Sequence, residues 1–277
     1  MLRIVGGSAR SASAQPWAII IPARFGSTRF PGKPLVPLRG ARGAAKSLIE
    51  RSWDAACGAA PSNHVWIATD EPRIADAATG FGAQVVLTSS NCRNGTERCW
   101  EAVIEAGIDA EVIINLQGDA PLTPPLAVEA LVETMLGTPG LHVATPMIRC
   151  STMMADRLAM DDRAGRIGGT TVVFDAGMNA LYFSRRVIPR APERMMQPPV
   201  YLHMGLYGYR RDALETYAGL APSPLEEVEG LEQLRFLHAG IPIRMIEVGV
   251  PPGGVWEVNN PGDVVSVEAA LAERHIA

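Results

Sequence analysis

Short apolar runs rich in β-branched residues recur along the first half of the chain, separated by stretches of helix length. Runs of this kind are typical of strands buried on both faces. The pattern predicts strands at 17–22, 64–70, 83–89, 111–119 and 141–148, and helices at 45–57, 72–81, 96–106 and 125–136. Strands and helices that alternate at this spacing predict a parallel sheet with helices on both faces and ligands at the carboxyl ends of its strands.

The alternation weakens after about residue 150. Strand-like segments at 170–175, 180–184 and 204–210 follow one another closely, which predicts an antiparallel lid or dimer-forming subregion over about 150–220. Helices and strands alternate again toward the end of the chain, with a predicted helix at 225–238, a strand at 243–248 and a terminal helix from 261. We therefore expect a flexible tail over 1–16 and a single α/β domain, with an inserted subregion, over 17–277.

Composition excludes several classes of protein. With 47% hydrophobic and 19% charged residues and a net charge of −4, the chain is neither disordered nor suited to coat a nucleic acid. No apolar run reaches the roughly 18 residues that span a bilayer, so we expect no membrane partner. The four cysteines form no CxxC pair, which favours reduced thiols and a cytoplasmic location.

The first predicted strand runs into a loop, PARFGSTRFPGKP at 22–34, that combines cations, glycines and hydroxyls. Glycine lets backbone N–H groups approach an anion, and arginine and lysine neutralise phosphate oxygens, so the loop predicts a polyphosphate site. It is not a Walker A loop, because five residues instead of four separate Gly26 from Gly32, and Pro34 stands where a hydroxyl would bind magnesium. The alternative is a basic surface loop that binds nothing.

A series of sequence blocks, in order along nearly the whole chain, resembles the sugar-acid cytidylyltransferases, most closely the 3-deoxy-manno-octulosonate (Kdo) cytidylyltransferases. The blocks are IIIPARFGSTRFPGKPL (19–35), ATDEPRIADAATGFGAQVVLTS (68–89), NGTER (94–98), INLQGD (114–119), LYFSRRVIP (181–189), HMGLYGYRR (203–211), PSPLEEVEGLEQLRFLHAG (222–240) and NPGDV (260–264). Any one block alone is weak evidence for this resemblance, whereas the ordered set is specific to the family.

The resemblance implies a Rossmann-like nucleotidyltransferase fold, with a mostly parallel sheet and an antiparallel dimerisation or lid subregion. It implies a reaction in which CTP and an acidic small-molecule acceptor, a Kdo-like sugar acid, give a CMP-sugar and pyrophosphate with Mg²⁺. The implied partners are these two substrates and a second copy of the chain in a homodimer.

The resemblance also assigns site residues. Catalysis falls to Arg24, Lys33 and Asp119, and Asp119 is also a magnesium ligand. The CTP contacts are Gly26, Ser27, Arg29, Asn94, Gly95, Thr96, Arg98 and Gln117. The sugar-acid contacts are Arg185, His203, Tyr207, Glu232 and Gln233. His203 and Tyr207 have the same parity on a predicted strand, so their side chains should project from one face.

Three positions depart from the family pattern. Ala120 replaces a carboxylate after Asp119, and Thr171 replaces a lysine. Asn259 stands where the family has its second magnesium-binding aspartate, so either the Asn259 amide oxygen or the carboxylate of Glu257, two residues away, is expected to serve. These departures leave other acceptors open, such as another ulosonic acid or a small phosphonate. A pseudoenzyme that binds CTP or CMP is a further alternative.

Overall fold

The computed structural model describes residues 16–26, 30–166, 168–190, 199–251, 254 and 257–277. The predicted tail, apart from Pro16, lies outside these ranges. None of the helices within them has the length and apolar character that crossing a bilayer requires.

One half of the main sheet is parallel. Its strands, in spatial order, are β5 (Gln84–Leu87), β4 (Val65–Thr69), β1 (Trp17–Ala23) and β6 (Val112–Leu116). Successive residues of β1 enter opposite hydrophobic cores, Ile19 and Ile21 on one face and Ala18 and Ile20 on the other. Burial on both faces explains why these strands are continuous apolar runs.

The other half of the ten-stranded sheet is largely antiparallel, with β12 alongside β7 as its parallel pair. Strand β11 lies between β6 and β7 and runs antiparallel to both. The strands are β11 (Leu206–Arg210), β7 (Val143–Arg149), β12 (Ile243–Glu247), β10 (Tyr201–His203), β8 (Thr171–Phe174) and β9 (Ala180–Ser184). The strands between 171 and 210 therefore extend the same sheet. A separate hairpin joins β2 (Pro37–Arg39) and β3 (Ala45–Ser47).

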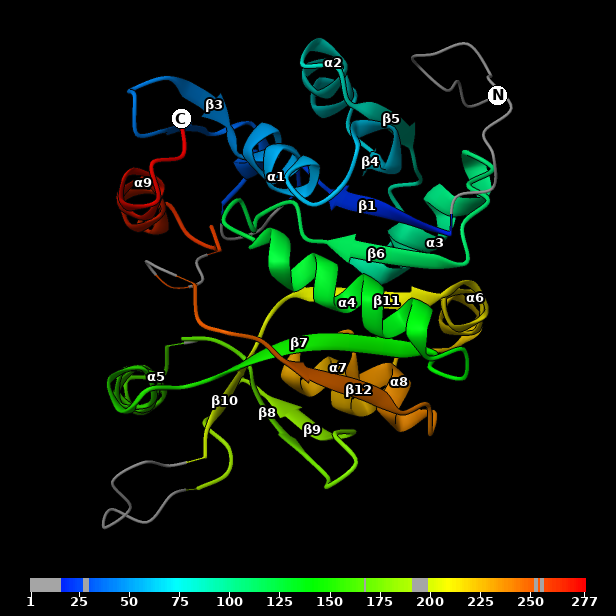
Figure 1. The fold of residues 1–277 in the computed structure, drawn as a ribbon, viewed down its shortest axis with the longest axis vertical. Helices are drawn as coiled ribbons and strands as arrows, with labels where there is room; N and C mark the ends of the chain where they lie inside the picture. The colour runs from blue at the N-terminus through cyan, green and yellow to red at the C-terminus, as the bar shows by residue number, and fades with distance from the viewer. Residues whose placement is uncertain (1–15, 27–29, 167, 191–198, 252–253, 255–256) are drawn as a thin grey trace.

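Helices cover both faces of the sheet (Figure 1). One core takes side chains from α1 (Leu48–Cys57), α2 (Pro72–Gly80) and α4 (Pro125–Gly137). The opposite core takes side chains from α3 (Gly95–Glu105), α6 (Arg211–Gly219) and α8 (Leu234–His238). The remaining helices are α5 (Thr152–Arg163), α7 (Pro224–Glu229) and α9 (Asp263–Glu273), with short 3₁₀ turns η1 (Lys33–Leu35) and η2 (Ser62–His64). The predicted α/β class is confirmed.

Several element boundaries differ from the prediction, and two of these differences have a clear local cause. The predicted helix at 45–57 starts at Leu48, because the Ser47 hydroxyl caps it by accepting from the Glu50 N–H. The predicted helix at 225–238 is two helices, because Gly230 ends α7 with a left-handed φ of 64°. The predicted strand at 204–210 begins only at Leu206. The pattern did not predict α5, α6 or the β2–β3 hairpin.

Gly208 allows α4 to pack closely on β11. A Cβ at this position would lie 2.9 Å from Met135 Cγ and 3.2 Å from Leu131 Cδ1. We expect Gly208→Ala to lower the free energy of unfolding by about 1–3 kcal/mol, because α4 must shift to relieve the contact. Urea denaturation measures this change. Gly137→Ala, where a Cβ meets no atom within 4 Å, is the matched control. Equal stability of the two variants would contradict this account of the packing.

Candidate active site

The carboxyl ends of β1 and β6 open into a cleft of about 1350 Å³. In Figure 1 the arrowheads of both strands point to the side of the molecule on which α5 and α9 lie. This is the edge at which a parallel sheet usually binds its ligands. The sequence-predicted site residues that line the cleft are Arg24, Lys33, Asn94, Gly95, Arg98, Gln117, Asp119, Arg185, His203, Tyr207, Glu232, Gln233, Glu257 and Asn259.

Four other predicted residues are not part of the described cleft lining. Ser27 and Arg29 lie outside the described residues. Gly26 is exposed but does not line the cleft. Thr96 is buried, and its hydroxyl lies 2.9 Å from the hydroxyl of Tyr209 inside the sheet-facing core. A side chain so placed stabilises the start of α3.

The phosphate-binding loop predicted from the sequence brings its lysine to the end of β6. Lys33 follows Gly32, which has a left-handed φ of 71°. The Lys33 ammonium donates to Asp119 Oδ2 at 2.5 Å and to the carbonyl of Val258 at 3.0 Å. Arg24 is exposed at the end of β1. Two cations thus lie at one end of the cleft.

Two carboxylates face this cationic end. Asp119 follows β6, and its carbonyl accepts from the Val258 N–H at 2.9 Å, which draws the segment containing Glu257 alongside. Burial raises the pKa of Glu257 to about 7, and the negative charge of Asp119 adds to the rise. Two carboxylates with no nitrogen or sulfur ligand form a donor set suited to a hard cation such as Mg²⁺, which completes its shell with water and phosphate oxygens.

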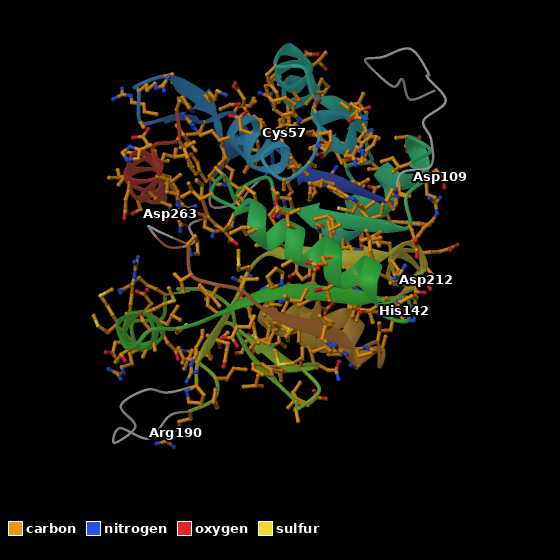
Figure 2. The ribbon with its side chains drawn as sticks, viewed as in Figure 1. Cys57, Asp109, His142, Arg190, Asp212 and Asp263 are labelled. Atoms are coloured by element: carbon orange, nitrogen blue, oxygen red, sulfur yellow. The ribbon has the colours of Figure 1, made fainter. Side chains whose placement is uncertain are left out.

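Asn259 is oriented toward Glu257. Its Nδ2 donates to Glu257 Oε2 at 3.3 Å, and its backbone N–H donates to Asp263 Oδ2 at 2.9 Å. Asp263 begins α9, and Figure 2 shows it on the side of the molecule opposite to Asp212 and His142. The start of α9 therefore fixes the backbone of Asn259, and the Asn259 amide in turn orients the carboxylate of Glu257.

The N-terminus of α3 forms the wall next to Gln117. Asn94 caps this helix by accepting from the Glu97 N–H at 2.9 Å. Glu232 Oε2 accepts from the Thr96 N–H at 3.1 Å. Burial raises the pKa of Glu232, and hydrogen bonds from the Thr96 and Gly95 N–H groups oppose that rise. Glu232 therefore binds the helix N-terminus in this structure.

A buried ion-pair network that the sequence analysis missed supports this wall. Arg235 is 1% exposed, and its guanidinium donates to Glu226 Oε1 at 2.6 Å and to Glu97 Oε1 at 2.9 Å. Arg98 is also buried, pairs with Asp70 at 3.3 Å and donates to Thr88 Oγ1 at 2.5 Å. The available sequence signal for Arg235 was a charged residue flanked on both sides by apolar residues in LRFL.

A second group of cleft residues, His203, Tyr207 and Gln233, is uncharged and polar, and we call it the neutral end. The predicted single strand carrying His203 and Tyr207 is wrong, because His203 ends β10 and Tyr207 lies in β11 after a turn. Their rings are nevertheless 5.3 Å apart. Burial lowers the pKa of His203 to about 3 and raises that of Tyr207 well above its usual value, so both are uncharged. Gln233 is 2% exposed, and its Nε2 has no hydrogen-bond partner among the described residues. Buried donors without a partner are rare in native proteins.

Thr171, Arg185 and helix α5 differ from what the sequence predicts around the neutral end. Thr171 donates to the Arg186 carbonyl at 2.6 Å and does not line the described cleft, whereas its neighbour Thr170 does. Arg185 donates to the carbonyls of Glu229 at 2.6 Å and Gly230 at 2.8 Å. The unpredicted helix α5 adds Met154, Arg157, Leu158 and Asp161 to the wall.

Comparison with known proteins identifies the class. A family model described as cytidylyltransferase matches residues 18–245. The chain is 45% identical to the 3-deoxy-manno-octulosonate cytidylyltransferase of Maricaulis maris, over 91% of this chain and 96% of that protein. It is 38% identical to the 8-amino-3,8-dideoxy-manno-octulosonate cytidylyltransferase of Shewanella halifaxensis, over 92% of this chain and 98% of that protein.

The fold is likewise similar to a solved structure. It matches that of a CMP:2-keto-3-deoxy-manno-octonic acid synthetase complexed with CTP, with a TM-score of 0.79 and 36% identity over 94% of this chain and 100% of that one. The chain belongs to the cytidylyltransferase family. The family and the enzyme class expected from the sequence, a nucleotidyltransferase, are therefore confirmed.

The Lys33 ammonium should contribute to triphosphate binding. A charge-assisted contact is worth about 1.5–3 kcal/mol, so we expect Lys33→Met and Arg24→Ala each to lower kcat/KM for CTP about tenfold or more. Steady-state kinetics with CTP varied and calorimetric CTP titration measure the loss. Lys46→Met is the control, because the chain's other lysine pairs with Asp54 away from the cleft. Unchanged CTP use in both test variants would exclude the assignment.

Proposed function

We propose that this protein is a CTP-dependent cytidylyltransferase that transfers CMP to a Kdo-like sugar acid and releases pyrophosphate. The observation that carries the proposal is that one cleft is lined by both a charged group and an uncharged polar group of side chains. Lys33, Asp119 and Glu257 form a charged end suited to a triphosphate, whereas His203, Tyr207 and Gln233 form a neutral hydrogen-bonding end. A nucleotide and a polyhydroxylated acceptor can therefore meet in the same cleft.

The charged end suits the proposed chemistry. Attack of an acceptor oxygen on the α-phosphorus of CTP breaks the bond to pyrophosphate and increases negative charge on the phosphate oxygens. Catalysis of such a step depends on positioning and on electrostatic stabilisation. Lys33 and Arg24 supply positive charge here, and we assign both to the triphosphate. The N-terminus of α3, with Asn94 and Gly95 beside Gln117, is the proposed site for the cytidine moiety.

The neutral end suits an acceptor rich in hydroxyl groups. The relatives named for 3-deoxy-manno-octulosonate and for its 8-amino derivative support an ulosonic acid in this position. We assign Tyr207, His203 and Gln233 to its hydroxyl and ring oxygens and Arg185 to its acidic group. Glu232 contributes by holding the start of α3 in place.

Asp119 and Glu257 are the proposed protein ligands of Mg²⁺. Their oxygens are the donors that this cation prefers, and the effect of Asp119 on the pKa of Glu257 is consistent with their proximity. When bound, Mg²⁺ would neutralise charge on the phosphates. Asn259 directs its amide hydrogen toward Glu257, so we assign the second carboxylate to Glu257 and an orienting role to Asn259.

Two finer points are also proposals. We expect a homodimer, because the sheet ends at β9, where Leu181 is 61% exposed on the edge strand. Light scattering coupled to size-exclusion chromatography measures its mass. We also expect a cytoplasmic location, in keeping with the four free cysteines. Fractionation of cells that express the protein tests this expectation.

Pyrophosphate release tests the whole function. The protein is incubated with CTP and Mg²⁺ and a panel of acceptors: Kdo, its 8-amino derivative, another ulosonic acid and a small phosphonate. Release with Kdo or the 8-amino derivative is the expected result, with CTP preferred over ATP, GTP and UTP. Release only with the phosphonate would move the acceptor to another class. CTP binding without turnover of any acceptor would identify a pseudoenzyme.

Metal binding separates Glu257 from Asn259. We expect Glu257→Gln and Asp119→Asn each to weaken Mn²⁺ affinity about tenfold or more, because each removes a charged oxygen ligand. Calorimetric titration of Mn²⁺ into the CTP complex measures this directly, apart from turnover. Glu129→Gln, on the exposed face of α4, is the control. If Glu257→Gln leaves the affinity unchanged while Asn259→Ala lowers it, the ligand is Asn259.

A further inference from the structure

Thr145 lies under the neutral end of the cleft without lining it. It is a fully buried residue of β7, and its hydroxyl oxygen has close polar neighbours. The His203 Nε2 lies at 2.9 Å, the Leu206 carbonyl at 2.7 Å and the Met204 carbonyl at 3.3 Å. Thr145 thus contacts the turn from β10 to β11 and the imidazole of His203 through a single oxygen.

The number of available hydrogens determines which atoms donate and which accept in this cluster. A threonine hydroxyl has one hydrogen, and a carbonyl oxygen can only accept. At 2.7 Å from the Leu206 carbonyl, the Thr145 hydroxyl must donate its hydrogen there, since two oxygens at that distance without a hydrogen repel each other. The contact with His203 is then a hydrogen bond only if His203 Nε2 carries the hydrogen.

The imidazole is therefore held in one tautomer and one orientation. Its ring lies between those of Phe183, at 5.1 Å, and Tyr207, at 5.3 Å. The ring is neutral, so a hydrogen on Nε2 leaves a lone pair on Nδ1. His203 lines the cleft and its Nε2 faces Thr145, so Nδ1 is the ring nitrogen left to meet a bound molecule.

We propose that Thr145 is a positioning residue that fixes the Nε2–H tautomer of His203, so that His203 Nδ1 is the hydrogen-bond acceptor of the imidazole. This inference rests on the proposed function and sharpens its substrate class. The imidazole then selects an acceptor molecule that offers a hydroxyl hydrogen to His203 Nδ1.

This arrangement discriminates between the acceptor classes left open by the sequence. A polyhydroxylated acid has a hydroxyl hydrogen for Nδ1. A fully ionised phosphonate group has acceptor oxygens alone, and one of these placed against Nδ1 would oppose two lone pairs. Thr145 therefore favours the sugar acid without touching it.

The tautomer can be measured before any substrate is added. Long-range ¹H–¹⁵N correlation spectra of ¹⁵N-histidine-labelled protein distinguish the two neutral tautomers, and the spectrum of His203→Asn assigns the signal. We expect the Nε2–H form in the wild type and in Thr145→Ser, which keeps the hydroxyl. Thr145→Val should lose that preference.

Kinetics then test the consequence for the substrate. We expect Thr145→Val to raise KM for the sugar acid about three- to tenfold, the value of one hydrogen bond, and to leave KM for CTP unchanged. Thr145→Ser should restore the wild-type KM. Thr134→Val, which loses a hydroxyl bonded to the Ala130 carbonyl within α4, controls for general destabilisation.

Two results would overturn the proposal. One is an Nδ1–H tautomer in the wild type. The other is a folded Thr145→Val protein with an unchanged KM for the sugar acid. If Thr145→Val does not fold, Thr145→Ala replaces it, and the wild-type spectrum still decides the tautomer. An absence of pyrophosphate release with every acceptor would contradict the proposed function, while leaving the tautomer measurement valid.

Discussion

The backbone ladder between β6 and β11 determines where the site lies. Leu206 pairs with Leu116 and Tyr207 with Asn115, so a strand from late in the chain lies directly beside the strand that ends before Gln117 and Asp119. Strand β11 also pairs with β7, the strand that carries Thr145. Because hydrogen bonds fix this register, the side chains that follow β6 and those of β11 keep a fixed separation in the cleft.

Charge is distributed unequally around this ladder. Lys33, Asp119 and Glu257 form the charged part of the cleft, whereas burial keeps His203 and Tyr207 uncharged. Removing a buried ion pair from water costs free energy, so these pairs act here mainly by fixing the relative positions of the elements that they join. The Arg235 pairs with Glu97 and Glu226 join α3 to α7 and α8, three segments that together form one wall.

The departures from the family pattern have structural explanations at two positions. Thr171 replaces a lysine, yet its hydroxyl bonds the Arg186 carbonyl and lies outside the described lining of the cleft. Asn259 replaces an aspartate, and its amide donates to Glu257, a carboxylate that lies beside Asp119. A carboxyl group is thus present two residues before the position that lacks one. For the replacement at Ala120, which is buried, the structure offers no explanation.

The sequence by itself determined the alternation of strands and helices, the cationic loop after β1 and the aspartate after β6, because these depend on local periodicity and turn chemistry. The resemblance of its motifs added the site residues, most of which line one cleft. Tertiary structure alone decided the insertion of β11, the contact of Lys33 with the Val258 carbonyl 225 positions away, and the bond from His203 to Thr145. These depend on strand pairing between distant segments, which no local pattern encodes.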